Sequence, residues 1–141
     1  MAKKRPVLGD AVHAEAFQLF RLLGFDSLTA ALGIEGEEED EVQYMAGMSM
    51  GRALVRRGRV RAHGPDEAHG LDGLMASFGE LYRRMGLGII EYRTGEDGSL
   101  IVSVAECAGC HGAEFVDRPI CFVEAGLLCG ILSEALGGAY T

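Results

Sequence analysis

The segment from residue 120 to residue 136 constrains the fold most, because it is apolar on almost every side of a helix. A helix without a polar stripe has to be buried among other elements. Asp117 and Pro119 mark its start, and Gly137 and Gly138 stop it. The sequence therefore predicts a central buried helix near the C-terminus. Its apolar positions are Ile120, Cys121, Phe122, Val123, Ala125, Leu127, Leu128, Cys129, Ile131 and Leu132.

An amphipathic helix and a hairpin are expected before it. Apolar residues recur at helical spacing from Leu71 to Met85, and Gly86 ends the pattern. Two strand-like runs follow, Leu87–Thr94 and Ser99–Glu106. The four residues between them, 95–98, form a turn, which predicts an antiparallel hairpin. Two strands alone are marginally stable, so the sheet looks incomplete.

Helices are also expected in the N-terminal half. The first runs from Asp10 to about Leu23, and a short one runs from Asp26 or Ser27 to Leu32. An acidic loop follows from Glu35, and a longer helix is expected from about Asp40 to Arg57. Gly47 and Gly51 in that helix permit close approach of another helix or, alternatively, of a ligand. The fold class is therefore α+β in a single domain, 1–141: N-terminal helices, an antiparallel β-hairpin or small sheet, and a central buried C-terminal helix.

The charge balance excludes a general polyanion binder. The formal net charge is −8, whereas neutralising phosphates requires a basic face, so nucleic acid is not expected as a partner. Five arginines, at positions 52, 56, 57, 59 and 61, follow the acidic run 37–41. We interpret the two clusters as solvated surface charges that offset each other, with an anionic ligand or partner as the alternative.

The location of the chain is predicted from what its ends and its apolar runs contain. The basic N-terminus is not followed by the unbroken apolar core of a secretory signal, and the longest apolar run, Pro119–Leu132, contains Glu124. We therefore predict a cytoplasmic protein without a membrane span. In a reducing compartment the four cysteines are metal ligands, redox thiols or buried small residues rather than disulfides.

Three of these cysteines and a histidine form the main chemical motif. Cys107, Cys110 and His111 follow the second strand, and Cys121 lies at the start of the buried helix. Thiolates and imidazole favour Zn²⁺ or a softer metal, and these four side chains would complete a tetrahedral site. The alternatives are a buried thiol cluster, a redox site, or c-type haem attachment through CAGCH, which ranks below zinc because no export signal is present.

The other polar groups of the last helix have simpler interpretations. Cys129 lies two turns beyond Cys121 and is interpreted as a small buried core residue. Glu124 is interpreted as exposed near the helix start, with a buried ligand or proton carrier as the alternative. No glycine-rich phosphate-binding loop follows a predicted strand, so an enzyme is not the expected class.

A family resemblance covers residues 71–138. The stretch FGELYRRMGLGIIEY, the hairpin, ECAGCHG and ICFVEAGLLCGILSEALGG together resemble the 4-vinyl reductase domain family. Cys121, Phe122, Gly126 and Gly130 carry its helix motif, and Cys107 or Cys110 carries the earlier cysteine. The resemblance implies a fold related to TRAPP subunits, a homodimer formed through helices, and a cavity near the buried helix. The family usually continues into two further strands with more cysteines, which this sequence lacks.

From these observations we predict a binding or sensor module for a small hydrophobic molecule or a zinc-like metal, with its pocket between the last helix and the hairpin. An assembly subunit of the TRAPP type, without a ligand, is the alternative. A haem protein or an accessory subunit of a vinyl reductase ranks third. The predicted ligand-binding residues are Cys121, Phe122, Glu124, Tyr82 and Phe78, and the predicted metal ligands are Cys107, Cys110, His111 and Cys121.

Overall fold

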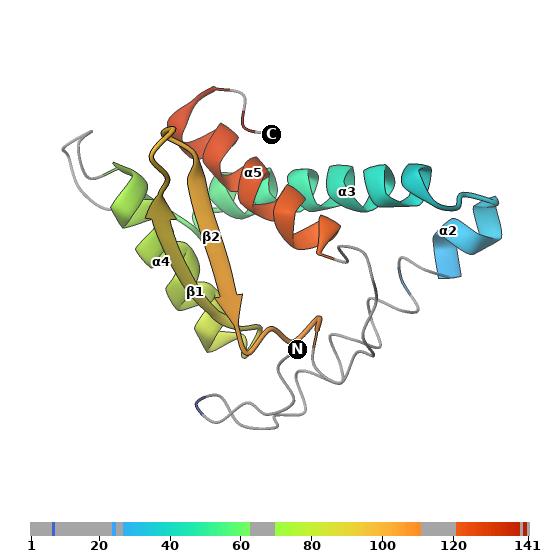
Figure 1. The fold of residues 1–141 in the computed structure, drawn as a ribbon, viewed down its shortest axis with the longest axis horizontal. Helices are drawn as coiled ribbons and strands as arrows, with labels where there is room; N and C mark the ends of the chain where they lie inside the picture. Colours follow the sequence, from blue (N-terminus) through green and yellow to red (C-terminus); the bar gives the residue numbers. More distant parts are fainter. Residues whose placement is uncertain are drawn as a thin grey trace.

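The computed structural model describes residues 27–62, 70–110, 121–138 and 140, together with residues 7 and 24. These residues form helices and one small antiparallel sheet, so the α+β class is confirmed (Figure 1). The helix predicted from Asp10 to Leu23 lies outside the described residues. The described elements are α2 (Ser27–Leu32), α3 (Glu37–Arg56), α4 (Gly70–Arg84), β1 (Ile89–Thr94), β2 (Leu100–Ala105) and α5 (Phe122–Leu136).

Helix α3 begins three residues earlier than the sequence predicts. The residues expected to be an acidic loop form its first turn, Glu37 to Asp40. Carboxylates are stabilised at a helix N-terminus because the backbone N–H groups there point at them. Glu39 also accepts hydrogen bonds from Thr29 Oγ1 at 3.1 Å and Gln43 Nε2 at 3.3 Å, which joins α2 to α3. The acidic run is therefore a helix start rather than a loop.

Glycines bring the backbones of α3 and α5 into direct contact. A Cβ added at Gly47 would overlap the Val123 carbonyl oxygen, and one added at Gly51 would lie 2.8 Å from Ile131 N. On α5, a Cβ at Gly126 would overlap the Tyr44 carbonyl oxygen, and one at Gly130 would overlap that of Met48. The spacing Gly47–Gly51 therefore serves close helix packing, as predicted, and the same spacing recurs in Gly126–Gly130.

The core lies where α5 meets α4 and the end of α3. Leu74 of α4 and Ile131 of α5 are 0% exposed, and both belong to the cluster that the apolar stripe of α4 forms with α5. Gly86 has φ 71° and ends the turn after α4, as predicted. The predicted buried helix is thus confirmed for the part that the structure describes, Phe122–Leu136. The buried core cluster consists of Val60, Leu74, Phe78, Leu81, Tyr82, Leu127, Ile131 and Leu132.

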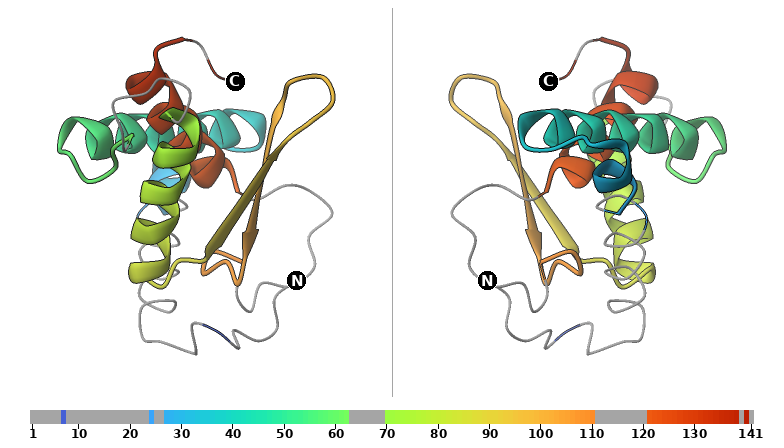
Figure 2. Two further views of the ribbon diagram at one scale, coloured as in Figure 1. Left: turned by 90° about the vertical axis from the view of Figure 1, so that its left-hand side faces the viewer. Right: turned by 90° about the vertical axis from the view of Figure 1, so that its right-hand side faces the viewer.

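The hairpin is a two-stranded sheet in the described residues, with Ile89 opposite Ala105 and Thr94 opposite Leu100. Side chains alternate between its faces, so Ile90 and Val104 share the face that packs against the core. Tyr92 lies on the same face and donates a hydrogen bond to Asp72 Oδ1 of α4 at 2.7 Å. In both views of Figure 2 the described helices lie on one side of the hairpin. Among the described helices, none combines the length and the hydropathy required to cross a membrane.

Candidate functional site

The chain turns inward directly after β2, and this turn buries the first cysteine. Glu106 adopts a left-handed conformation, φ 52°, which is uncommon for a residue with a side chain. The next residues are fixed by hydrogen bonds from Ala108 N to Leu87 O at 2.8 Å and from Cys110 N to Cys107 O at 3.3 Å. As a result Cys107 is only 7% exposed.

Three of the four predicted metal ligands come together at this turn. Cys121 immediately precedes α5, and its sulfur lies 3.6 Å from that of Cys110. The thiol of Cys107 interacts with both of the others. Two thiolates on a tetrahedral zinc ion lie about 3.8 Å apart, given Zn–S bonds of about 2.3 Å. The Cys110–Cys121 separation therefore matches the spacing of two zinc ligands.

Two thiols of this cluster, Cys107 and Cys121, hold their protons firmly because their pKa values are raised. The hydrogen bond with Cys110 is the largest cause that raises the pKa of Cys107, and burial adds to it. Hydrogen bonds with Cys107 and then Cys110, followed by burial, raise the pKa of Cys121. The thiolate is the reactive form of cysteine, so Cys107 and Cys121 are poor nucleophiles at neutral pH. A cation bound by the sulfurs would favour the thiolate forms and so oppose both shifts.

Glu124 is half-buried with both carboxylate oxygens buried, which corrects the prediction of an exposed side chain. It lies in the first turn of α5, as expected. The reason for the burial is that Gly126 of α5 packs against α3 and Cys121 lies beside the cysteine turn, so the Glu124 carboxylate is enclosed although Ala125 beside it is exposed. The carboxylate raises the pKa of both Tyr82 and Cys121, which places it beside the cluster.

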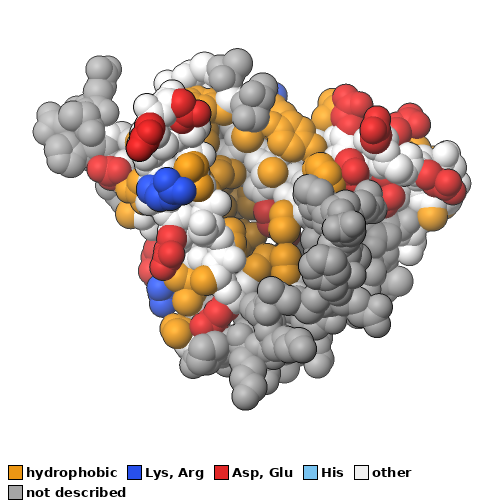
Figure 3. Space-filling model, in the orientation of Figure 1, with side chains coloured by type: hydrophobic (Ala, Val, Ile, Leu, Met, Phe, Trp, Pro, Cys, Tyr) orange, Lys and Arg blue, Asp and Glu red, His pale blue; other side chains and the backbone are white. Residues whose placement is uncertain are grey.

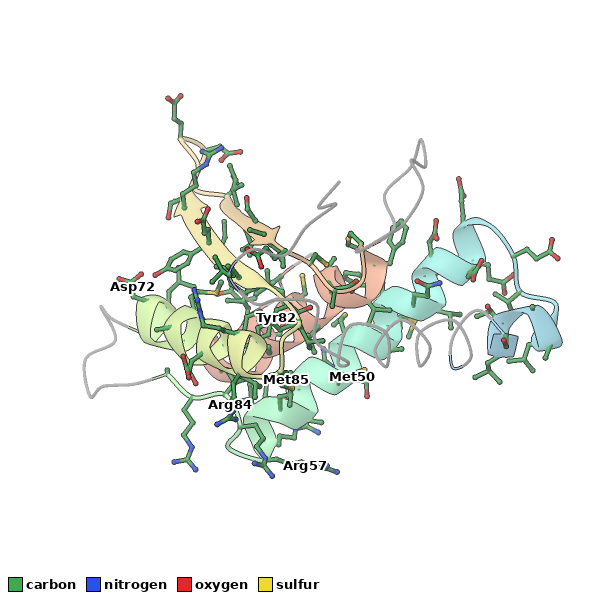
Figure 4. The ribbon with its side chains drawn as sticks, turned by 90° about the horizontal axis from the view of Figure 1, so that it is seen from below. Met50, Arg57, Asp72, Tyr82, Arg84 and Met85 are labelled. Carbon is green, nitrogen blue, oxygen red and sulfur yellow. The ribbon has the colours of Figure 1, made fainter. Side chains whose placement is uncertain are left out.

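Tyr82 of α4 lies beside the cluster, and Phe78 packs against Tyr82. Tyr82 is 2% exposed and packs against Phe78 in a tilted arrangement, with ring centroids 5.1 Å apart and the ring planes at 53°. Burial is the largest cause that raises the pKa of Tyr82, and Glu124 and the three thiols add to it. Figure 4 shows Tyr82 in the interior, whereas Met50 and Arg57 lie at the outside of α3. The cluster therefore has an aromatic ring and a buried carboxylate beside it.

The remaining predicted site residues are not part of this cluster. Phe122 lines a shallow depression on α3 together with Glu37, Asp40, Glu41 and Tyr44. His111 lies outside the described residues. Within the described ranges, no set of three His, Cys, Asp or Glu side chains already has the geometry of a metal site. The thiols would therefore have to rotate to surround an ion.

A separate apolar groove runs between the hairpin and the second half of α5. Its volume is about 590 Å³. The space-filling view shows hydrophobic side chains gathered in a hollow between these elements (Figure 3). The groove lies near the hairpin turn, whereas the thiols lie at the other end of β2. It is lined by Leu71, Thr94, Gly98, Ser99, Leu100, Leu128, Cys129, Leu132, Leu136 and Tyr140.

Cys129 lies in this groove and is half-buried, not a fully buried core residue as predicted. Its thiol also forms a hydrogen bond with Tyr44, and this bond is the largest cause that raises the pKa of Tyr44 to about 12. The sequence analysis missed the leucine wall of the groove. The sequence pattern that could have predicted it is the position of Leu128 and Leu132, which lie on the side of α5 away from Gly126 and Gly130.

Comparisons with known proteins give little further information. No known family model matches the sequence, and no solved structure matches it. The chain is similar to an uncharacterized protein of Methanocaldococcus jannaschii, with 30% identity over 129 residues. The similarity covers 92% of this chain and 64% of the relative. The resemblance to 4-vinyl reductase domains and TRAPP subunits therefore stays a prediction.

Proposed function

We propose that the chain is a metal-binding module that holds a zinc-like ion through Cys107, Cys110 and Cys121. The observation that carries the proposal is the meeting of three thiols, with 3.6 Å between the sulfurs of Cys110 and Cys121. Soft thiolates select zinc and similar metals over magnesium or calcium. Rotation about the side-chain bonds of the three cysteines would exchange thiol–thiol hydrogen bonds for metal–sulfur bonds.

Two residues are candidates for the fourth ligand. Glu124 is the candidate among the described residues, because its buried carboxylate lies beside Cys121. His111 is the other, because it directly follows Cys110 and completes a Cys₃His set. With either ligand the ion would link the end of β2 to the start of α5. The protein would then bind metal without an open coordination position, as structural and sensory zinc sites do.

Metal uptake by matched cysteine variants tests the proposal. We expect one zinc ion per chain after reconstitution, measured by elemental analysis, and loss of that ion in Cys121→Ser. Cys129→Ser is the control and should retain it, because Cys129 lies in the apolar groove. Glu124→Gln and His111→Ala, compared by the cobalt absorption spectrum, distinguish the two candidates for the fourth ligand.

A second readout uses alkylation followed by mass spectrometry. Zinc should slow the labelling of Cys110 by a maleimide and leave the labelling of Cys129 unchanged, whereas Cys107 and Cys121 should react slowly with or without zinc. Zinc uptake that survives Cys121→Ser would contradict the proposal, as would a chain that takes up none. A Soret band in the purified protein would favour haem instead.

The apolar groove supports a second candidate function, binding of a small hydrophobic molecule. A groove of about 590 Å³ with five leucines among its ten lining residues has the size and chemistry of a site for such a molecule. We expect a fluorescent fatty-acid probe to bind there and Leu128→Trp, which fills the groove, to abolish binding. Met50→Trp, at an exposed position of α3, is the control. Equal binding by both variants would show that the probe binds elsewhere, and no binding to the native chain would favour an assembly subunit without a ligand.

A further inference from the structure

A basic pocket of about 420 Å³ lies where the turn after α3 meets the second half of α4. Arg59 and Arg61 come from the turn, Arg84 comes from the last turn of α4, and all three are exposed. Figure 4 shows Arg84 at the same edge of the molecule as Arg57, which follows the end of α3. The lining residues of this arginine pocket are Gly58, Arg59, Arg61, Ala76, Ser77, Glu80, Leu81 and Arg84.

A buried side chain and backbone hydrogen bonds hold the turn that carries the first two arginines. Val60 lies between them, is 0% exposed and belongs to the core cluster. Arg59 N donates a hydrogen bond to Leu54 O at 2.9 Å, and Arg61 N donates one to Ser77 Oγ of α4 at 3.1 Å. The backbone is therefore fixed on both sides of Val60. A ligand of these arginines would not have to order the turn, which lowers the entropy cost of binding.

The guanidinium of Arg61 is oriented by the same turn. Its Nε donates a hydrogen bond to Gly58 O at 3.1 Å. Gly58 has φ 64°, and a Cβ added there would lie 2.7 Å from Arg61 Nη2, so the glycine lets the guanidinium lie against the turn. This bond uses only the Nε proton. The terminal amino groups of Arg61 still have protons to donate to a ligand.

The arginine pocket has an excess of positive charge. It contains three arginines and one acidic residue, Glu80, in a chain whose formal net charge is −8. In the part of the chain that the structure describes, none of these three arginines forms an ion pair, whereas Arg56 pairs with Glu134. Like charges that gather in this way repel one another, and a bound anion would relieve the repulsion.

We propose that the arginine pocket binds a small molecule that carries a phosphate group. A guanidinium donates parallel hydrogen bonds to two oxygens of one phosphate, which a point charge cannot do. Arg59 and Arg61 would donate from the turn and Arg84 from α4. The hydroxyl of Ser77 accepts the bond from Arg61 N and still has its own proton to donate to a phosphate oxygen. The proposal does not depend on the thiol site or on the apolar groove.

The distribution of charge favours a small ligand over a nucleic acid or an anionic membrane. Those partners extend across the surface and would meet the acidic first turn of α3, Glu37 to Asp40, which repels them. That turn lies about 30 Å from the pocket along the 20 residues of α3. The Debye length at physiological salt is about 8 Å, so a small anion in the pocket is screened from these acids.

Titration of the metal-free chain with inorganic pyrophosphate, followed by calorimetry, tests the proposal. We expect one pyrophosphate to bind per chain, and Arg61→Gln or Arg84→Gln to weaken binding roughly 10- to 100-fold, because each removes charged hydrogen-bond donors. Glu80→Gln should bind more tightly than the native chain, because it removes the negative charge that lines the pocket. Circular dichroism confirms that each variant is folded.

Arg93→Gln on β1 is the matched control, since it removes the same charge at an exposed position outside the pocket. It should bind pyrophosphate like the native chain, and so should Cys121→Ser, which separates this proposal from the thiol site. A native chain that binds no pyrophosphate would overturn the proposal, as would equal binding by Arg84→Gln and Arg93→Gln. Tighter binding to duplex DNA or to phosphatidylserine vesicles, lost in Arg84→Gln, would also overturn it.

Discussion

Around the cysteine cluster, burial and neighbouring groups raise the pKa values of individual residues. Cys107 and Cys121 are held protonated mainly by hydrogen bonds with neighbouring thiols, whereas Tyr82 is held protonated mainly by its burial. Glu124 adds negative charge beside Tyr82 and Cys121. Each neighbour that raises a pKa here is also a group with which an added cation would interact favourably. The same groups therefore keep the thiols protonated in the metal-free protein and would favour the proposed metal ion.

These shifts predict that the metal-free protein loses stability in alkali. The native state retains protons on Cys107, Cys121 and Tyr82 at a pH where the unfolded chain releases them, near 9.0 for the thiols and 10.0 for the phenol. The native state then binds more protons than the unfolded state, so the free energy of unfolding falls as pH rises. Below pH 9 the contribution of these groups is fully present.

Urea unfolding at neutral and alkaline pH measures this effect. Tyr82→Phe keeps the ring packed against Phe78 and removes one titrating group, so we expect a shallower fall in the free energy of unfolding above pH 10. A free energy of unfolding that is unchanged between pH 8 and pH 11 would show that these groups have the same pKa values in the native and the unfolded state.

At the scale of elements, the contact between α3 and α5 is the principal packing arrangement. Four glycines, two on each helix, allow the backbones to touch, and the space that each leaves is filled by the other helix's backbone. This contact fixes where α5 starts and hence where Cys121 lies. The hairpin is held less extensively, through Ile90 and Val104 in the core and the Tyr92–Asp72 hydrogen bond.

Replacing a contact glycine should therefore destabilise the fold. We expect Gly126→Ala to lower the free energy of unfolding by roughly 1 to 3 kcal/mol, because overpacking exceeds the gain in helix propensity. Gly79→Ala in α4 is the control, because its added Cβ would lie 3.7 Å from Ile90 Cβ, an ordinary contact. That variant should be neutral or up to about 1 kcal/mol more stable. Chemical denaturation compares them, and equal effects would contradict the close-contact explanation.

The whole molecule has its candidate thiol site at one end of β2 and its apolar groove near the hairpin turn at the other. An ion bound by Cys107, Cys110 and Cys121 would join the hairpin to α5. A ligand that binds only the folded state stabilises it by mass action. Metal binding should consequently appear as a gain in stability of the entire domain.

We expect free zinc at a hundred times its Kd to stabilise the chain by about 2.7 kcal/mol, which raises Tm by roughly 5 to 10 °C. Differential scanning calorimetry with zinc, and then with a chelator, measures the change. Magnesium should have no effect, because it prefers oxygen ligands. Cys129→Ser should respond as the native chain does, and a zinc response that persists in Cys121→Ser would contradict the assigned site.

The sequence alone determined the elements whose patterns are local. The all-round apolar run predicted a buried α5, the spacing from Leu71 to Met85 predicted α4, and the glycine-rich turn at 95–98 predicted the hairpin. Gly47 and Gly51 indicated close helix packing, because only glycine lets backbones touch. These predictions succeeded because periodicity and glycine placement act over a few residues.

Only the tertiary structure decided which distant side chains meet. The approach of Cys121 to Cys110 depends on the inward turn after Glu106 and on how deeply α5 packs against α3, neither of which is encoded by spacing in the sequence. Glu124 looked like an exposed residue at a helix start, yet its surroundings bury its carboxylate oxygens. Burial and proximity depend on many long-range contacts. The sequence could therefore identify the cysteines as candidate ligands, whereas only the fold determines that their thiols meet.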